Sequence, residues 1–354
     1  RMDGAGTTFG HLVQIRSRCH VPARTTPCDR RYLWHVACFT MKVLVTGGAG
    51  FIGTNLVRRL TSTHGITEVV IIDDLSFGDR KNLAGLDVKF IEGSILDDRA
   101  LARASAGVEA IVHLAARSSV PRSVAEPMAA HEVNATGTAM VLEAARRNDR
   151  AHVIVASSSS VYGATEVLPK TESLPTRPIS PYAASKLASE AYTLAWSHSY
   201  DLPALALRFF NVFGPLQPPL HTYAAVVPAF LSAALQGRPL PVHGNGMQSR
   251  DFTFVDSVVS VIVDALGRRV SHEEPVNLAF GSRVTLLELV EVIEGVLGHS
   301  LPIDFQPARV GDVAASQADP TSLRNLFPGL KPTPLELGIR STVEWFENAR
   351  PWEV

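Results

Sequence analysis

From Met41 onward, short apolar runs alternate with longer amphipathic stretches. The runs are rich in Val and Ile and apolar on both faces, which is typical of buried parallel strands. Several of the stretches between them have a helical period, and Ile52, Leu56 and Leu60 share one face of the first. The alternation predicts an α/β fold, a Rossmann-type doubly wound parallel sheet. The predicted strands are 42–47, 68–73, 88–93, 110–115, 152–158 and 204–210.

The composition of the chain changes after about Asn211, where Pro and Gly become frequent. Helical patterns separated by Pro-rich joints follow. We therefore predict a Rossmann domain over 41–210 and a smaller, mainly helical C-terminal substrate lobe over 211–350, interleaved with the first domain. The predicted helices of this lobe are 224–236, 256–267 and 285–297.

Residues 1–40 differ from the rest, with six arginines, all three cysteines and no clear periodicity. We expect a disordered or non-native extension ahead of a native start at Met41. A targeting peptide is one alternative. Another is a metal site, although cysteine spacings of nine and ten do not match a zinc knuckle. Its candidate ligands are Cys19, His20, Cys28, His35 and Cys38.

Composition and charge narrow the class of protein. Hydrophobic residues make up 46% and charged residues 19%, which suits a globular protein with a core. The net charge is −1, and without a basic excess we expect no nucleic-acid partner. No apolar run is long enough for a membrane span, so we expect no membrane association. With no cysteine after Cys38, we expect no disulfide framework and a cytoplasmic protein.

The stretch "VTGGAGFIG" joins the first predicted strand to the first predicted helix. Its glycines Gly47, Gly50 and Gly53 allow a tight turn, close approach of a pyrophosphate, and packing of helix on strand. The helix N-terminus, from Phe51 and Ile52, offers free amide groups to phosphates. The second predicted strand ends in Asp73, whose carboxylate can accept both ribose hydroxyls of NAD and repels a 2′-phosphate. These residues predict NAD as cofactor; the alternative is a structural turn and a surface acid.

At the end of the fourth predicted strand, small Ala115 and Ala116 leave room for a ligand in the crevice. His113 in such a place is expected to be a buried histidine with satisfied hydrogen bonds.

"SPYAASK" carries the candidate chemistry. Ser180 can cap a helix, with Pro181 at its first position, and Tyr182 and Lys186 then share a face. A phenol has a pKa near ~10, and a nearby ammonium favours the phenolate; lowering this pKa by about 3 units takes roughly 4 kcal/mol. Tyr182 can then take a proton from an alcohol while a nicotinamide takes the hydride. A serine of "ASSSSVYG" (156–163) can steady the developing carbonyl.

Taken together, the motifs resemble those of the extended short-chain dehydrogenase/reductase family, and within it the nucleotide-sugar 4-epimerases of the UDP-glucose 4-epimerase type. The resemblance runs from Met41 to about Arg350. The motifs that carry it, in order, are "TGGAGFIG", "DDLSFG", "HLAARSSVPRSVAEP", "SSSSVYG", "SPYAASK", "RFFNVFGP", "SRDFTFVD" and "RVGDV".

The resemblance implies a role for each catalytic position. Tyr182 is the base, Lys186 is its electrostatic partner and binds the nicotinamide ribose, and Ser158 is the catalytic hydroxyl. Ser159 and Ser160 stand where sugar 4,6-dehydratases carry Asp and Glu, and serines cannot act as that acid/base pair near neutral pH. The implied activity is inversion of carbon 4 of a UDP-hexose through a transient 4-keto intermediate, with bound NAD and no metal.

The resemblance also implies contacts to the two nucleotides. Ser94 and Ile95 stand near the adenine, where many relatives have "GDI" instead of "GSI", which leaves adenine recognition weaker or confined to the backbone. On the substrate side, arginines suit the diphosphate because their planar fork makes paired bonds to phosphate oxygens. The implied substrate contacts are Arg250 and Arg309 for the diphosphate, Asn211 for the phosphate–sugar junction, Asp312 for the ribose or pyrophosphate, His243 for the uracil, and Ser118, Ser158 and Ser159 for the sugar.

The identity of the hexose stays open. Glucuronate 4-epimerases usually show Thr at the Asn211 position and Arg near Pro218, and this chain has neither. A neutral sugar, glucose/galactose or an N-acetylhexosamine, is therefore favoured. UDP-glucuronate is the main alternative, because Arg117 brings a positive charge near the site. Further alternatives are a nucleotide-sugar dehydratase or oxidoreductase, and a non-catalytic NAD-binding regulator.

Members of this family commonly form homodimers through a four-helix bundle. The resemblance places the two helices of each subunit at about 127–147 and 181–199.

Overall fold

The structure is a computed structural model that describes residues 40–219, 225–308 and 314–353 of the 354-residue chain. The expectations for residues 1–39, including the alternative metal site, lie outside the described residues, as do those for Arg309 and Asp312.

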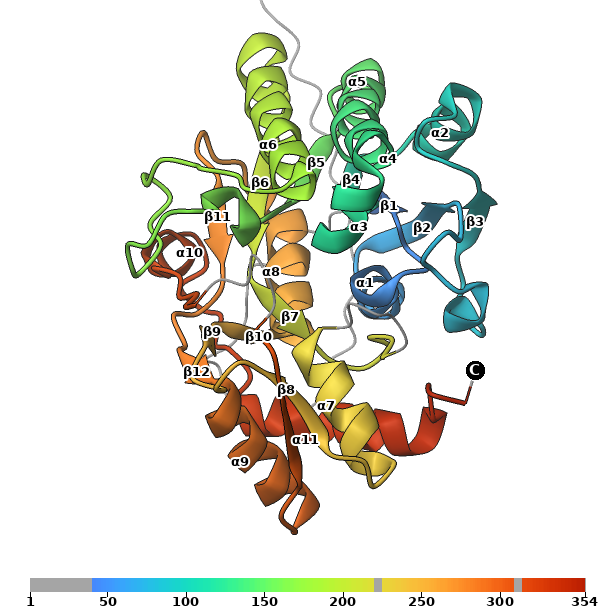
Figure 1. The fold of residues 1–354 in the computed structure, drawn as a ribbon. Helices are drawn as coiled ribbons and strands as arrows, with labels where there is room; N and C mark the ends of the chain where they lie inside the picture. Colours follow the sequence, from blue (N-terminus) through green and yellow to red (C-terminus); the bar gives the residue numbers. More distant parts are fainter. Residues whose placement is uncertain (1–39, 220–224, 309–313, 354) are drawn as a thin grey trace, which may run out of the picture. The chain divides into compact units, whose positions relative to one another are not determined.

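A seven-stranded parallel sheet forms the centre of the fold, in the order β11-β6-β5-β4-β1-β2-β3 (Figure 1). The chain runs outward from β1 to β3 and then returns to place β4 on the other side of β1. That reversal creates a crevice at the carboxyl ends of β1 and β4, where ligands bind in folds of this kind. The predicted fold class is confirmed. The strands are β1 (Met41–Thr46), β2 (Ile66–Asp73), β3 (Lys89–Glu92), β4 (Ala110–His113), β5 (His152–Ser158), β6 (Ala204–Phe209) and β11 (Val276–Leu278).

Helices cover both faces of this sheet, because alternate residues of its strands point to opposite sides. Val43 and Val45 of β1 pack in a core with α1 (Phe51–Thr61) and α8 (Val255–Arg268). Leu44, between them, packs on the other side in a core lined by further helices. These are α2 (Asp98–Ser105), α5 (Gly137–Arg147) and α6 (Pro181–Tyr200).

The remaining elements of this part are short and lie in the connections. A short π-helix, η2 (Glu132–Thr136), joins α4 (Pro127–His131) to α5, so the predicted helix 127–147 is helical throughout. The connections hold η1 (Arg80–Leu83), α3 (Val120–Ala125), α4 (Pro127–His131), η2 (Glu132–Thr136) and η3 (Ser159–Tyr162).

The C-terminal part has a second apolar core among α7 (Val226–Leu235), α9 (Leu286–Leu297) and α11 (Leu335–Ala349). It also supplies the edge strand β11 of the central sheet and the helix α8 that covers one face of that sheet. Phe39–Val354 cluster as one compact unit, so the division at 210/211 stays a prediction. The elements are β7 (Asn211–Phe213), α7 (Val226–Leu235), β8 (Leu240–His243), β9 (Ser249–Arg250), β10 (Phe252–Phe254), β12 (Val284–Thr285), α9 (Leu286–Leu297), β13 (Ile303–Gln306), α10 (Thr321–Leu326) and α11 (Leu335–Ala349).

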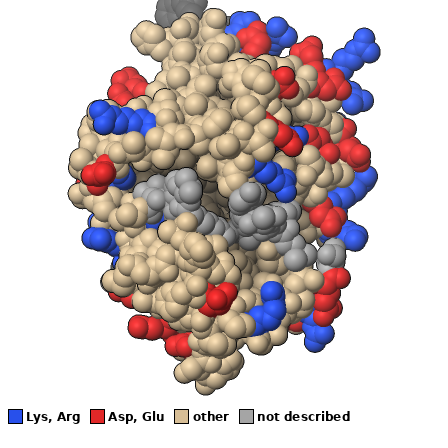
Figure 2. Space-filling model, in the orientation of Figure 1, with Lys and Arg blue, Asp and Glu red and all other residues tan. Residues whose placement is uncertain are grey.

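Figure 2 shows one face of the molecule, hollowed near its centre. Charged side chains of both signs lie mostly toward the outer edge of this face. In the described part of the chain, no helix combines the length and the apolar character that a membrane span requires.

Candidate active site

The turn between β1 and α1 is built from glycines because no side chain fits there. Gly47 has φ of +71°, and a Cβ on it would lie 2.7 Å from the backbone nitrogen of Ala115. A Cβ on Gly53 would lie 2.1 Å from the carbonyl oxygen of Gly47. Among the described residues, no side chain caps α1 at Gly50. The amides of the first helical turn are therefore available to a phosphate group, as the sequence predicts.

Asp73 ends β2 beside this turn and is almost buried, with 8% of its surface exposed. Its carboxylate accepts hydrogen bonds from the backbone N–H groups of Ala49 and Leu75, each at 2.9 Å. Burial raises the pKa of Asp73, and these two bonds oppose the rise. The alternative of a solvated surface acid is therefore wrong: Asp73 holds the glycine turn and retains lone pairs for a ribose.

The two residues expected near the adenine have local roles as well. The Ser94 hydroxyl accepts a hydrogen bond from Leu96 N at 3.2 Å. The Ile95 side chain is buried and packs where a Cβ on Gly137 would come within 2.5 Å of it. The Ile95 side chain is therefore part of the core, and its contact with a cofactor stays a prediction.

His113 ends β4 inside the protein and is fully bonded. Its Nδ1 lies 2.7 Å from Thr46 Oγ1 and its Nε2 lies 3.0 Å from Thr138 Oγ1. Burial, and secondarily the charge of Lys186, lower the pKa of His113 to about 3. The ring is neutral and structural, as expected. Next to it, Ala115 N donates to the same Thr46 hydroxyl at 3.2 Å, which ties the segment after β4 to the end of β1.

Helix α6 begins as the sequence predicts. The Ser180 hydroxyl accepts a hydrogen bond from Ala183 N at 3.1 Å, and Pro181 takes the first helical position. One turn on, the buried Lys186 ammonium donates to the carbonyl oxygen of Ala156 at 2.7 Å. Burial lowers the pKa of Lys186 to about 8.

Tyr182 and Ser158 lie close together across α6 and the end of β5, near enough for the Ser158 hydroxyl to act on the phenol. Burial raises the pKa of Tyr182, and the Ser158 hydroxyl opposes the rise. The sequence predicts a pKa lowered by Lys186; in this structure desolvation is the larger influence, and the ammonium points to a backbone carbonyl instead.

The other serines of the run are placed differently from Ser158. The Ser158 oxygen also accepts from Ser160 N at 3.2 Å and from Ser160 Oγ at 2.9 Å. Ser159 is half-buried at the start of η3. Of these three serines, Ser158 is the one that acts on the pKa of Tyr182.

The described residues expected at the substrate lie on several elements. Asn211 begins β7, and its Nδ2 donates to the backbone oxygen of Asp251 at 3.2 Å. Arg250 is half-buried on β9, directly before Asp251. His243 ends β8 with its ring bonded to a backbone carbonyl, and Ser118 is exposed on the loop after β4. The bonds described here link Asn211 to the Arg250 segment and do not extend to Ser118 or His243.

The sequence missed Asp251, although it lies in the motif "SRDFTFVD". Its side chain is fully buried and accepts from Gly281 N at 3.1 Å, Ser282 Oγ at 2.8 Å and Ala318 N at 3.1 Å. Burial raises the pKa of Asp251, while these bonds oppose it. One carboxylate therefore ties the strand that carries Arg250 to two other segments.

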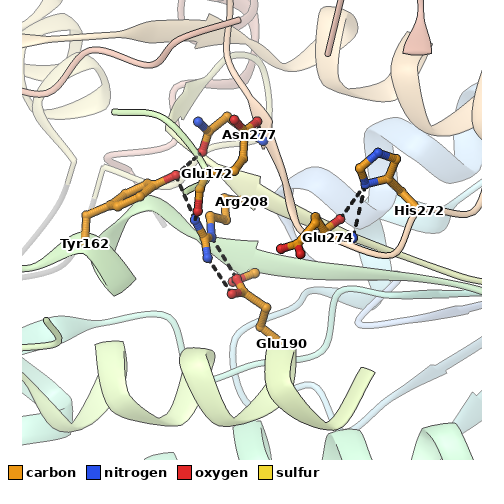
Figure 3. A network of polar contacts seen from close by, with 8 residues as sticks. Tyr162, Glu172, Glu190, Arg208, His272, Glu274 and Asn277 are labelled. Atoms are coloured by element: carbon orange, nitrogen blue, oxygen red, sulfur yellow. Dashed lines mark hydrogen bonds and ion pairs between the residues drawn. The ribbon is translucent and has the colours of Figure 1, made fainter. Parts of the chain in front are cut away.

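The sequence also missed a buried ion pair behind the site (Figure 3). Arg208 Nη2 lies 2.6 Å from Glu190 Oε1 and Arg208 Nε lies 2.9 Å from Glu190 Oε2, with both side chains only 4% exposed. Arg208 also donates to the Tyr162 hydroxyl at 2.8 Å, which donates to Asn277 Oδ1 at 2.7 Å. Two signals could have found the pair: an arginine inside an apolar strand run, and a glutamate one turn after the lysine of the candidate pair.

In the described ranges, no cluster of three or more His, Cys, Asp or Glu side chains is arranged to hold a metal ion.

Comparison with known proteins gives consistent matches. The model of the NAD dependent epimerase/dehydratase family matches residues 43–279. A UDP-glucose 4-epimerase of Mycolicibacterium smegmatis is 39% identical over 87% of this chain and 99% of its own length. A probable UDP-glucuronate 4-epimerase of Rhizobium meliloti is 32% identical over 87% of this chain and 97% of its own. Among solved structures, a UDP-N-acetylglucosamine 4-epimerase from Methanobrevibacter ruminantium, in complex with UDP-N-acetylmuramic acid, superposes with a TM-score of 0.82 at 36% identity, over 88% of this chain and 99% of that one.

Proposed function

Because the chain belongs to the NAD-dependent epimerase/dehydratase family, we propose that it is a UDP-hexose 4-epimerase. It inverts carbon 4 of the sugar through a transient 4-keto intermediate. The observation that carries the proposal is the placement of Tyr182 beside Ser158 at the carboxyl end of β5, with Lys186 one helical turn away.

The residues present fit NAD. A cradle that a Cβ at Gly47 or Gly53 would fill, with uncapped helix amides behind it, suits the diphosphate. Asp73 would hold a ribose, and Lys186 would hold the ribose next to the nicotinamide. When bound, NAD supplies a hydride acceptor that returns the hydride to carbon 4, so no net oxidation results.

Tyr182 is the proposed proton acceptor and donor. Its phenolate takes the proton of the 4-hydroxyl as the hydride leaves carbon 4, and it returns a proton to the carbonyl oxygen when, after the keto sugar has turned, the hydride adds to the opposite face of carbon 4. Each unit of pKa that burial adds to Tyr182 costs about 1.4 kcal/mol of phenolate stability, so positive charge and the Ser158 hydroxyl must offset it. Ser158 can also donate to the developing carbonyl oxygen.

Epimerisation is favoured over dehydration by the residues that follow Ser158. A 4,6-dehydration moves protons at carbons 5 and 6 and needs an acid/base pair there. Ser159 and Ser160 are hydroxyls that do not ionise near neutral pH.

For the substrate, we propose that Arg250 and Arg309 bind the diphosphate and Asn211 the phosphate–sugar junction. Asp312 would contact the ribose, His243 the base, and Ser118 and Ser159 the sugar. The similarity to epimerases of UDP-glucose and UDP-N-acetylglucosamine supports a neutral hexose.

UDP-glucuronate is the second candidate, supported by a relative named a probable UDP-glucuronate 4-epimerase. One contact weighs against it. Arg117, the nearby cation, is already paired with Glu126 at 2.8 Å. A substrate carboxylate would have to compete with that pair.

We also propose a homodimer through α5 and α6, which pack side by side (Figure 1). Apolar side chains on and next to these helices are exposed, among them Met128 at 63%, Tyr192 at 41% and Tyr200 at 44%. A molar mass in solution of twice one chain, falling to one chain in Tyr192→Glu, would support this. A cytoplasmic location is proposed because no cysteine follows Cys38.

The function is tested by incubating the enzyme with UDP-glucose, UDP-N-acetylglucosamine and UDP-glucuronate, without added NADH, and separating the products by chromatography. We expect one pair of 4-epimers to reach equilibrium with no rise in absorbance at the NADH band. Steady NADH production would instead indicate an oxidoreductase. An accumulating 4-keto-6-deoxy product would indicate a dehydratase.

A further inference from the structure

The buried carboxylate of Glu190 contacts both structural elements that carry the catalytic groups. On α6, it follows Tyr182 by eight residues and Lys186 by four, so the three side chains share one helix face. Across from it, Ser157 Oγ donates to Glu190 Oε2 at 2.9 Å, and Ser157 immediately precedes Ser158. We propose that Glu190 is a positioning residue that holds Tyr182 and Lys186 in register with Ser158; this rests on the proposed function.

The register is visible in three consecutive residues of β5. The carbonyl of Ala156 accepts from Lys186, the hydroxyl of Ser157 donates to Glu190, and Ser158 lies beside Tyr182. Each residue of this strand end is thus matched to one residue of the helix face. A slip of α6 along β5 would break all three contacts together.

Arg208, the ion-pair partner of Glu190, lies on the strand next to β5. On β6 it stands directly opposite Ser157 of β5, so Glu190 is hydrogen-bonded to neighbouring residues of both strands. Arg208 extends this hydrogen-bond network through the Tyr162 hydroxyl to Asn277 of β11 (Figure 3). Because both atoms of the carboxylate are bonded and the charges are desolvated, the arrangement is directional and stiff.

The charges around Tyr182 allow its ionisation to report on this positioning. Lys186 shares its helix, and His113 of β4 stays neutral because its pKa is about 3. Glu190 and Arg208 neutralise each other. Among these groups, the Ser158 hydroxyl lowers the pKa of Tyr182, so losing the register raises that pKa.

The test uses two variants. Glu190→Met combined with Arg208→Met removes both charges, which leaves no unpaired buried ion and permits folding. Ser157→Ala removes only the hydrogen bond between β5 and Glu190, so it is the milder change. Leu289→Ala, in the separate core of α9, is the control for a general loss of stability. In each background, the ultraviolet absorbance change on raising the pH is measured with Tyr182 present and again with Tyr182→Phe. The difference between the two curves reports the ionisation of Tyr182.

We expect Tyr182 to ionise about 0.5 pH unit or more higher in the double variant, and less so in Ser157→Ala. The kcat on the sugar nucleotide should fall between about tenfold and about a hundredfold with KM little changed, and its acid limb should move to higher pH. Leu289→Ala should show neither effect at a matched Tm. Ionisation of Tyr182 unchanged in both variants overturns the role of Glu190. Absence of turnover in the wild type would reject the proposed function alone, because the ionisation measurement needs no substrate.

Discussion

Gly53→Ala tests whether the first turn is shaped for a diphosphate. The added Cβ would stand 2.1 Å from the carbonyl oxygen of Gly47 and 2.8 Å from the Cα of Gly48, both backbone atoms. Ordinary contacts lie at about 3.5 Å, so the turn must move on the order of 1 Å. Overpacking of this kind costs about 1–3 kcal/mol of stability.

The same movement should cost cofactor affinity. A displaced turn loses at least one charge-assisted hydrogen bond to the diphosphate, worth about 1.5–3 kcal/mol, which raises the Kd for NAD about 10- to 150-fold. Calorimetric titration of cofactor-free protein with NAD measures this, and thermal unfolding measures the stability.

Gly295→Ala is the matched control. Gly295 lies within α9, and a Cβ there meets nothing within 4 Å among the described residues. This variant should be more stable by about 0.5–1 kcal/mol and bind NAD normally. If Gly53→Ala matches the wild type in both Tm and Kd, the reasoning about the turn is refuted.

Three further predictions concern Tyr182, Arg250 and the buried histidines. Tyr182→Phe should lower kcat by about 10²- to 10⁴-fold with NAD affinity kept; undiminished turnover would remove Tyr182 from the mechanism. Arg250→Ala should raise KM about 10- to 150-fold, with partial recovery in Arg250→Lys; an unchanged KM would place the diphosphate elsewhere. Burial lowers the pKa of His113 to about 3 and of His152 to about 4, below the 6.5 of an unfolded histidine. The unfolded chain therefore binds more protons, and the free energy of unfolding should fall below pH 6.5 by about 1.4 kcal/mol per pH unit for each histidine, down to the folded pKa; urea titrations that give a flat profile would contradict this.

The parts of the fold that could be predicted are those with a local signal. The long apolar runs became strands, and the cap at Ser180 began α6 as expected. The edge strand β11 could not be predicted, because three residues, Val276–Leu278, show no period.

In the candidate site too, the residues with a local signal could be predicted and those brought together by tertiary packing could not. Tyr182 and Lys186 follow from spacing on one helix, but the direction of the Tyr182 pKa depends on burial, which spacing does not report. Glu190 and Arg208 meet across an 18-residue separation on different elements. Such pairing is set by tertiary packing, and the sequence offers only the oddity of an arginine in an apolar strand.

The most direct test of the central claim is the fate of the hydrogen at carbon 4. The enzyme is incubated in ordinary water with the UDP-hexose that it epimerises, labelled with deuterium at carbon 4, and the product is examined by mass spectrometry and NMR. Because the proposed mechanism returns the same hydride to carbon 4, the product should keep the deuterium there. Loss of the label to solvent during inversion would contradict the account.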